Sequence, residues 1–333
     1  MAHGERSRGR RTVTAAAAVR PTSRSGLRAV DPRRDLTGLA DLIELAFLES
    51  LDPSGRRMTQ EMRRYGRLGW VGWLFGHLML PPAAYPQGYV WMEGGRIVGN
   101  GSLMPVEGTA GRWVLANVAV HPQYRRRGIA RSIVAACLGL AERRWAKEVI
   151  LQVKARNEAA RDLYRKFGFA ERGTRVSWRK TQTAGDASFG KPARRRRDED
   201  RREQWALAER VVPLGLVWPH PLRASLFRPA TWYSADPWTH WIWPSQGPLQ
   251  AALSARADPD GGTEMFLVCA PEAVGQAEAP LLSLAVPAAV QRGVRIRLES
   301  EAGAGEEVVR SLGFQEEHRL TWMRWRGRPR PGG

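Results

Sequence analysis

The chain has 333 residues, of which 43% are hydrophobic, and a formal net charge of +19, so it is long enough for two domains with buried cores. No apolar stretch reaches the length of a membrane-spanning helix, the N-terminus lacks a secretory apolar region, and Cys137 and Cys269 are the only cysteines. These features exclude a membrane protein, a disulfide framework and a cysteine-based metal site. The basic residues are dispersed along the chain, which disfavours nucleic-acid binding. We expect a cytoplasmic protein, a monomer or homodimer.

The first elements are a disordered extension over residues 1–25, rich in Arg, Ser and Ala, and then a strand over 26–30. Apolar residues at helical spacing predict a helix over 35–47 and a second helical region over 59–80. Glu93, Gly94 and Gly95 separate two apolar runs within 88–104, which predicts a hairpin.

The most informative segment follows the hairpin. A strand is predicted from Trp113 to Val120, and Pro122 ends it because proline cannot donate to a sheet ladder. After a basic turn, a helix begins near Ile129, with apolar residues recurring along one face. Its first N–H groups lack partners within the helix and the dipole is positive there, so this end suits a phosphate group. Gly128 lets the backbone approach such an anion closely.

The next segment has a β-branched strand over 148–157 ending in Asn157, a short helix that contains Leu163 and Tyr164, and then Phe167-Gly168-Phe169. With the Arg-x-x-Gly-x-Ala turn at 125–130, this order resembles the GCN5-related N-acetyltransferase (GNAT) superfamily. The resemblance is specific over about residues 113–180 and looser back to Gly26. It implies an α/β fold with a mixed, mostly antiparallel sheet flanked by helices.

The resemblance also implies a reaction, in which a primary amine attacks the acyl carbonyl of acetyl-CoA directly within a ternary complex. The partners are then acetyl-CoA, as co-substrate, and an amine acceptor, with no metal. Carried over position by position, it assigns one catalytic residue, Tyr164, as the proton donor to the leaving thiolate. It assigns acetyl-CoA binding to Val118, Ala119, Val120, Arg125, Arg126, Arg127, Gly128, Ile129, Ala130, Arg131 and Asn157.

Asn157 and Tyr164 could each have a purely structural role instead of a functional one. Asn157 precedes Glu158-Ala159-Ala160 and would serve equally well as a helix N-cap. Tyr164 could be a half-buried aromatic on a helix.

The acceptor is less defined than the cofactor. The closest resemblance within the superfamily is to enzymes that acetylate protein N-termini, but those usually carry a Glu general base where this chain has Gln152. Glu93, Glu107 or a water held by His121 could take the proton instead. An α-amine with a pKa of about 7.7 to 8.0 needs little help. The alternative is an acetyl-CoA-binding sensor or scaffold that has lost turnover.

The remainder of the chain predicts a linker and a repeat. Residues 181–203 are charged and lack periodicity, which indicates a flexible linker. Beyond it, Leu312-Gly313-Phe314 parallels Phe167-Gly168-Phe169, but no Arg-x-x-Gly-x-Ala turn recurs. We therefore divide the chain into a first module (residues 26–180) and a degenerate second module (residues 204–328). Trp218, Trp232, Tyr233, Trp238, Trp241 and Trp243 open the second module, as core packing or as a substrate-stacking wall.

Overall fold

The computed structural model describes residues 25–48, 53–68, 87–106, 109–180, 192–212, 216–217, 220–221, 227, 238–258, 261–290 and 295–327. Several predictions lie outside this part of the chain: most of the N-terminal extension, the second helical region beyond residue 68, Glu107, residues 181–191 of the linker, and Trp218, Trp232 and Tyr233. Within the described ranges, no helix is long and apolar enough to cross a membrane.

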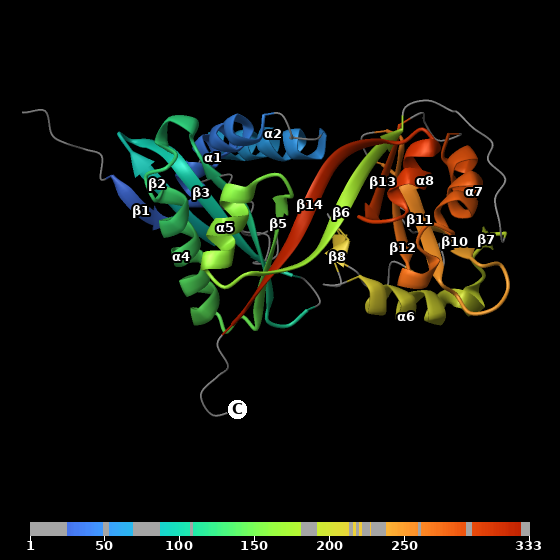
Figure 1. Cartoon of the computed structure of the whole chain (residues 1–333). Helices are drawn as coiled ribbons and strands as arrows, with labels where there is room; N and C mark the ends of the chain where they lie inside the picture. Colours follow the sequence, from blue (N-terminus) through green and yellow to red (C-terminus); the bar gives the residue numbers. More distant parts are fainter. Residues whose placement is uncertain are drawn as a thin grey trace, which may run out of the picture.

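The first module has the predicted succession of a strand, two helices, a hairpin, and alternating strands and helices (Figure 1). Its elements are β1 (Gly26–Ala29), α1 (Pro32–Phe47), α2 (Pro53–Arg67), β2 (Gln87–Glu93), β3 (Arg96–Pro105), β4 (Arg112–Val120), the short 3-10 turn η2 (Pro122–Tyr124), α4 (Ile129–Arg143), β5 (Glu148–Lys154), α5 (Glu158–Lys166) and β6 (Ala170–Lys180). The hairpin, the central strand and the start of α4 lie where the sequence predicted them.

The second module repeats part of this order. Its elements are β7 (Arg194–Arg195), η3 (Asp198–Asp200), α6 (Arg201–Val211), β8 (Leu216–Val217), β9 (His220–Pro221), β10 (Thr239–Trp243), β11 (Ala251–Ala257), β12 (Thr263–Cys269), η5 (Pro271–Ala273), α7 (Glu278–Val290), β13 (Ile296–Glu301), α8 (Glu306–Ser311) and β14 (Gln315–Arg326).

The expectation of a flexible linker is wrong for residues 192–203. Arg194 donates to both carboxylate oxygens of Asp200, at 2.7 and 2.8 Å, and Arg196 donates to the Gln204 side chain. β7 pairs with β10, and α6 begins at Arg201. The charged run is ordered because its arginines find carboxylate and amide partners within the fold.

In the part of the chain that the structure describes, twelve strands form one sheet in the order β1-β2-β3-β4-β5-β14-β6-β13-β12-β11-β10-β7. The pairs β4 with β5 and β12 with β13 are parallel, and the other pairs of this sheet are antiparallel. This confirms the predicted mixed, mostly antiparallel sheet.

The two modules exchange their last strands. β14, from the end of the chain, lies between β5 and β6 of the first module, whereas β6 pairs with β13 of the second. Figure 1 shows β6 and β14 running side by side from one half of the molecule to the other. The limits at 180 and 204 stay a prediction, and the sheet is continuous across them.

Helices cover the sheet on both faces. α4 packs on β2, β3 and β4, and its predicted apolar stripe is buried: Ile133, Val134, Cys137, Leu138 and Ala141. The contact is close because β3 has glycine beneath it; a Cβ on Gly101 would lie 2.5 Å from Ile133 Cγ2. α1 also contacts β3 and β4, on the opposite face from α4. In the second module, α7 contacts β10 to β13.

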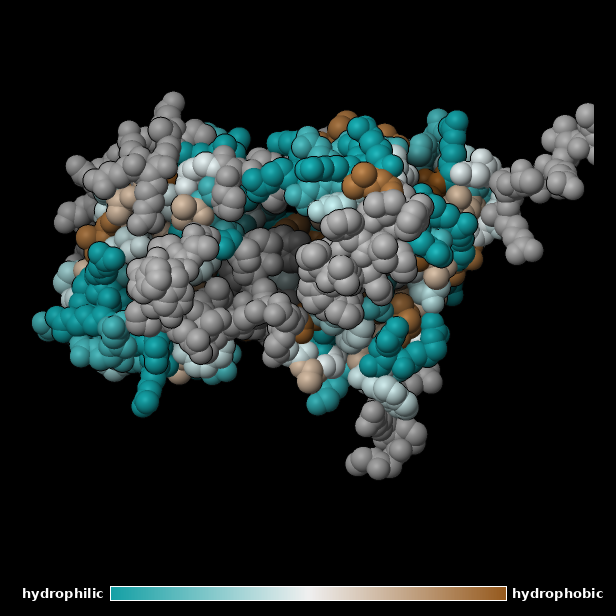
Figure 2. Space-filling view, turned by 180° about the vertical axis from the view of Figure 1, so that it is seen from behind, coloured by the Kyte–Doolittle hydropathy of each residue, from teal (hydrophilic) through white to brown (hydrophobic). Residues whose placement is uncertain are grey.

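The coloured part of one face is largely hydrophilic (Figure 2). On the face seen in Figure 2, hydrophobic residues lie singly or in small groups among hydrophilic ones. Trp241 and Trp243 are buried in the second module's core, and Trp238 stacks edge-on against Phe266. Core packing therefore explains the described part of the tryptophan cluster.

Candidate active site

The central feature of the first module is a divergence between β4 and β5. These parallel strands pair only from Arg112 with Glu148 to Val114 with Ile150, and β5 pairs with no residue of β4 beyond that point. Val118, Ala119 and Val120 lie on the diverged part of β4. Two strands that separate in this way leave facing backbone groups without sheet partners, so an extended ligand can hydrogen-bond to them. We call the gap between the diverged parts of β4 and β5 the slot.

The predicted cradle lies at the end of this slot. η2 follows β4, Arg126 and Gly128 adopt positive φ angles of 64° and 76°, and α4 begins at Ile129. Among the described residues, none accepts a hydrogen bond from the backbone N–H groups of residues 126–131. A row of unpaired donors at the positive end of a 15-residue helix favours an anion.

Contacts within the turn hold its shape. The Arg125 Nε atom donates to the Val120 carbonyl at 3.3 Å, and the Arg127 guanidinium lies 4.9 Å from the centre of the Tyr124 ring. His121 accepts from the Gln123 N–H through Nδ1, which leaves its proton on Nε2. The exposed Arg126 and Arg131 side chains have no polar partner among the described residues, so they stay available to an anion.

Gly128 provides the first prediction. A Cβ at this position would meet no atom within 4 Å, so the cradle itself leaves room for a side chain, but the φ of 76° strains any β-branched residue. We expect Gly128→Val to weaken acetyl-CoA binding about tenfold or more, as measured by calorimetry. Gly128→Asn is the matched control, because Asn tolerates this backbone region, and it should bind more tightly than the Val variant. Unchanged affinity in a folded Val variant would remove Gly128 from the site.

Asn157 lies where β5 gives way to α5, and it is the N-cap of that helix. Its side-chain oxygen accepts a hydrogen bond from the Ala160 N–H at 3.2 Å. The helix-capping role, which the sequence offered as an alternative to ligand binding, is therefore present in the structure. The residue is also exposed at the end of the diverged strand, and the amide NH₂ is left free to donate to a ligand.

Tyr164 is buried on the inner face of α5, with 6% of its surface exposed, and its ring meets Phe169 edge-on. Burial raises the pKa of the phenol above its ordinary value, and the group is protonated at neutral pH, as phenols ordinarily are. Its hydroxyl has no hydrogen-bond partner among the residues that the structure describes. A protonated, unengaged phenol is suited to donate a proton.

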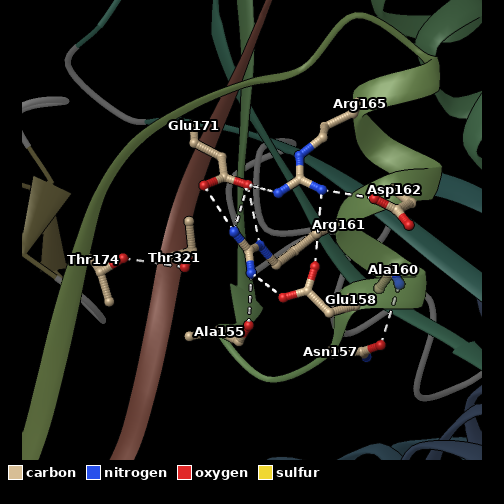
Figure 3. A network of polar contacts seen from close by, with 10 residues as sticks. All are labelled: Ala155, Asn157, Glu158, Ala160, Arg161, Asp162, Arg165, Glu171, Thr174 and Thr321. Carbon is tan, nitrogen blue, oxygen red and sulfur yellow. Dashed lines mark hydrogen bonds and ion pairs between the residues drawn. The ribbon is translucent and has the colours of Figure 1, made fainter.

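Ion pairs fix α5 against the sheet (Figure 3). Asn157 is the N-cap of this helix and Tyr164 lies within it. Glu171, at the start of β6, accepts from Arg161 through both carboxylate oxygens at 3.1 Å and from Arg165 at 2.6 Å. Arg161 also donates to the Ala155 carbonyl at the end of β5. The helix is thereby tied to the strands on either side of it in the sequence.

The position that would hold a general base carries Gln152. It lies on β5 opposite Trp322 of β14 and is half-buried. Of the other candidates, Glu93 ends β2 at the hairpin turn and His121 directly follows β4. The structure thus places His121 beside the slot, at the point where the turn begins.

The equivalent turn of the second module is filled by the chain itself. η5, a glycine with positive φ (Gly275, 86°) and α7 repeat the geometry of the first cradle. Here the buried Glu278 carboxylate accepts a hydrogen bond from the Gly275 N–H at 2.8 Å. Burial raises the pKa of Glu278, whereas hydrogen bonds from backbone N–H groups lower it. A carboxylate therefore occupies the place that the first module leaves open.

A cavity of about 320 Å³ lies next to this carboxylate, between the ends of β12 and β13. Apolar and small residues line much of it, together with Glu278, Ser300 and Glu301. Gly305 closes the wall over Glu278, since a Cβ there would lie 2.0 Å from Glu278 Oε1. The Glu278 side chain thus lies both in the turn and in the wall of this cavity.

Two features of the site were not predicted from the sequence. The first is Asn100 of β3, which is buried and donates a hydrogen bond to the backbone of β4. The sequence feature that could have pointed to it is a polar residue inside an otherwise apolar and glycine-rich strand. The second is Glu278, which reads in the sequence only as an acidic residue in the first turn of a helix.

The comparisons with known proteins agree with this geometry. The sequence profile of the acetyltransferase (GNAT) family matches residues 47–169. N-alpha-acetyltransferase 30 of Schizosaccharomyces pombe is 37% identical over 62 residues, which are 19% of this chain and 41% of that protein. The match therefore spans about two fifths of the length of this curated relative.

Solved structures resemble the fold over both modules. A GCN5-related N-acetyltransferase from Sphaerobacter thermophilus aligns with a TM-score of 0.59 and 16% identity, over 91% of this chain and 96% of that one. A tandem GNAT protein from the clavulanic acid biosynthesis pathway aligns with a TM-score of 0.53 and 18% identity, over 92% and 100%. At these identities the likeness concerns the fold. Residues 47–169, which contain the cradle, thus match the acetyltransferase (GNAT) family, and the fold of the chain is like that of these solved structures.

Proposed function

We propose that this protein is an N-acetyltransferase that moves the acetyl group of acetyl-CoA to a primary amine, either a protein N-terminus or a small molecule, in a single site of the first module. The observation that carries the proposal is the continuity of two features. The unpaired N–H groups of residues 126–131 adjoin the slot between β4 and β5, so one ligand with a phosphate end and an extended acyl arm fits both.

In this proposal the chain binds and orients, and it moves one proton. The N–H groups of the cradle hold the pyrophosphate, Asn157 holds the pantetheine arm, and the backbone of Val118 to Val120 holds the acyl oxygen. The amine nitrogen bonds to the carbonyl carbon as the C–S bond breaks. Tyr164 gives its proton to the departing sulfur. Positioning and oriented donors then supply most of the acceleration.

The amine must lose a proton during the reaction, and Gln152 cannot accept it. We propose a water held by His121 as the acceptor, because this residue directly follows β4, where the turn begins. An α-amine with a pKa of about 7.7 to 8.0 is partly neutral at physiological pH. The demand on the base is therefore small. Two buried, unpaired thiols, Cys137 and Cys269, fit a reducing cytoplasm.

The filled second cradle leads to a prediction of stoichiometry. Because Glu278 satisfies donors that a pyrophosphate would need, we expect calorimetry to find one acetyl-CoA per chain. In Gly128→Val the affinity of this single site for acetyl-CoA should fall, and no second site of high affinity should remain. Two equivalent sites would contradict the assignment of the second module as degenerate.

An acetyl-CoA-binding sensor is the second candidate, and Gln152 is the observation that favours it. A sensor would bind acetyl-CoA through the same cradle without turnover. Thiol release from acetyl-CoA across a panel of amines and N-terminal peptides separates the two, since only an enzyme makes the release depend on the amine.

A further inference from the structure

β4 contains a kink at Asn117, where the backbone has a φ of +53°. In the pairing of β4 with β3, Ser102 lies opposite Ala116 and Asn100 lies opposite Ala119. Two residues of β3 thus span three of β4, so β4 carries one extra residue, a β-bulge. The kink follows soon after Val114, the last residue of β4 that pairs with β5.

The bulge determines which side chains face the helix core. Ala116 and Ala119, three residues apart, both lie on the face of Asn100 and Ser102, opposite α4. Val118 and Val120 pack against the α4 core. If the extra residue were absorbed into regular pairing, the strand beyond it would shift by one residue, and its side chains would change faces. The conformation of Asn117 therefore sets the orientation of the backbone that lines the slot.

Asn100 holds this kink in place. It is 1% exposed, and its Nδ2 atom lies 3.0 Å from the Asn117 carbonyl oxygen. A carbonyl oxygen only accepts hydrogen bonds, so the group that faces it must be the amide NH₂. The other side-chain atom, Oδ1, is buried and has no hydrogen-bond partner among the residues that the structure describes. An unpaired buried acceptor is costly, so the site retains this amide for something other than the stability of the strand.

We propose that Asn100 is a positioning residue of the acetyl-transfer site: by binding the Asn117 carbonyl it fixes the left-handed kink that directs the backbone of Val118 to Val120 into the slot. This inference rests on the proposed function for its effect on rate, but the clamp itself exists in the free protein. The N–H groups of the pyrophosphate cradle begin beyond β4, at residue 126, so the clamp acts on the acyl end of the site and leaves the phosphate end unchanged.

The first test distinguishes the role of the Asn117 backbone conformation from the role of its side chain. Asn117→Gly and Asn117→Val both remove the side chain, but glycine accepts a φ of +53° whereas valine resists it. We expect kcat of Asn117→Val to fall about 10- to 100-fold, as a displacement of about 1 Å does. Asn117→Gly should keep at least about tenfold more activity than the Val variant. Equal loss in both would overturn the proposal.

The second test removes the clamp. Asn100→Ala should lower kcat about 10- to 100-fold with the affinity for CoA within about twofold of wild type, because the cradle is intact. Ser102→Ala is the control, since Ser102 is buried on the same face of the same strand and lies 3.4 Å from Asn100 Nδ2. It should keep wild-type kcat. Wild-type kcat in Asn100→Ala, or a parallel loss of kcat and CoA affinity, would contradict a positioning role.

Amide hydrogen exchange of the free protein gives a readout that needs no turnover. Faster exchange in Asn100→Ala and Asn117→Val, confined to the peptide covering residues 115–120, is the expected result. Exchange as slow as in wild type would overturn the clamp. If the wild-type protein transferred no acetyl group to any amine, the proposed function would fail, whereas exchange and CoA affinity would still decide the clamp.

Discussion

Replacing Tyr164 with Phe should lower kcat by about 10²- to 10⁴-fold, the usual contribution of general-acid assistance, with little change in KM for acetyl-CoA. The substitution keeps the ring that meets Phe169 and removes only the hydroxyl. Because the buried phenol is protonated at neutral pH, the hydroxyl acts through its proton. A fall in kcat without a rise in KM marks an interaction made only in the transition state. Steady-state kinetics with a saturating amine measures both constants.

Tyr89→Phe is the matched control for this experiment. Tyr89 of β2 also carries a phenol, but its oxygen accepts a hydrogen bond from Arg143 at the far end of α4. Wild-type kcat is expected in this variant. Full activity in Tyr164→Phe would instead assign Tyr164 to packing and leave the leaving-group acid unidentified.

A chain that ends before β14 should neither unfold cooperatively nor bind CoA, although all the cradle residues are present. β14 pairs with β5 and β6, and its Trp322 and Met323 are buried against first-module strands and helices. Removing it exposes two strand edges and opens the core that holds α4 and α5. Circular dichroism during thermal unfolding and calorimetry with CoA measure the two losses.

The repeat boundary at residue 180 gives the complementary fragment. A chain of residues 25–180 also lacks β14, so we expect it to behave as the longer truncation does. Adding a separate fragment of residues 192–327 should restore CoA binding, because that fragment supplies β14 and accepts β6 through β13. A first-module fragment that binds CoA with wild-type affinity by itself would contradict the strand exchange.

Local sequence patterns predicted the parts of the site that depend on local geometry. The start of α4 followed from apolar spacing and from Gly128, and the end of β4 followed from Pro122. Asn157 was predicted as a ligand or as an N-cap, and the structure places it at the N-cap. These features depend on a few neighbouring residues, so a single sequence contains enough information to find them.

Long-range pairing was not predictable in the same way. Nothing in the alternation of residues along β6 and β14 states whether each strand pairs within its own module or crosses to the other. The charged run at 194–202 was misread because the partners of its arginines, such as Asp200 and Gln204, become neighbours only in the fold. The hydrogen bond by which the Glu278 carboxylate fills the second turn likewise depends on the conformation of the chain at Gly275.

The most direct test of the account is thiol release from acetyl-CoA, followed with wild-type protein across small amines and N-terminal peptides. The account predicts release that depends on the amine, exceeds spontaneous hydrolysis, and falls in Gly128→Val at subsaturating acetyl-CoA and in Tyr164→Phe at saturating acetyl-CoA. Acetyl-CoA that binds once per chain, with no amine increasing thiol release, would contradict an acetyltransferase and favour the sensor.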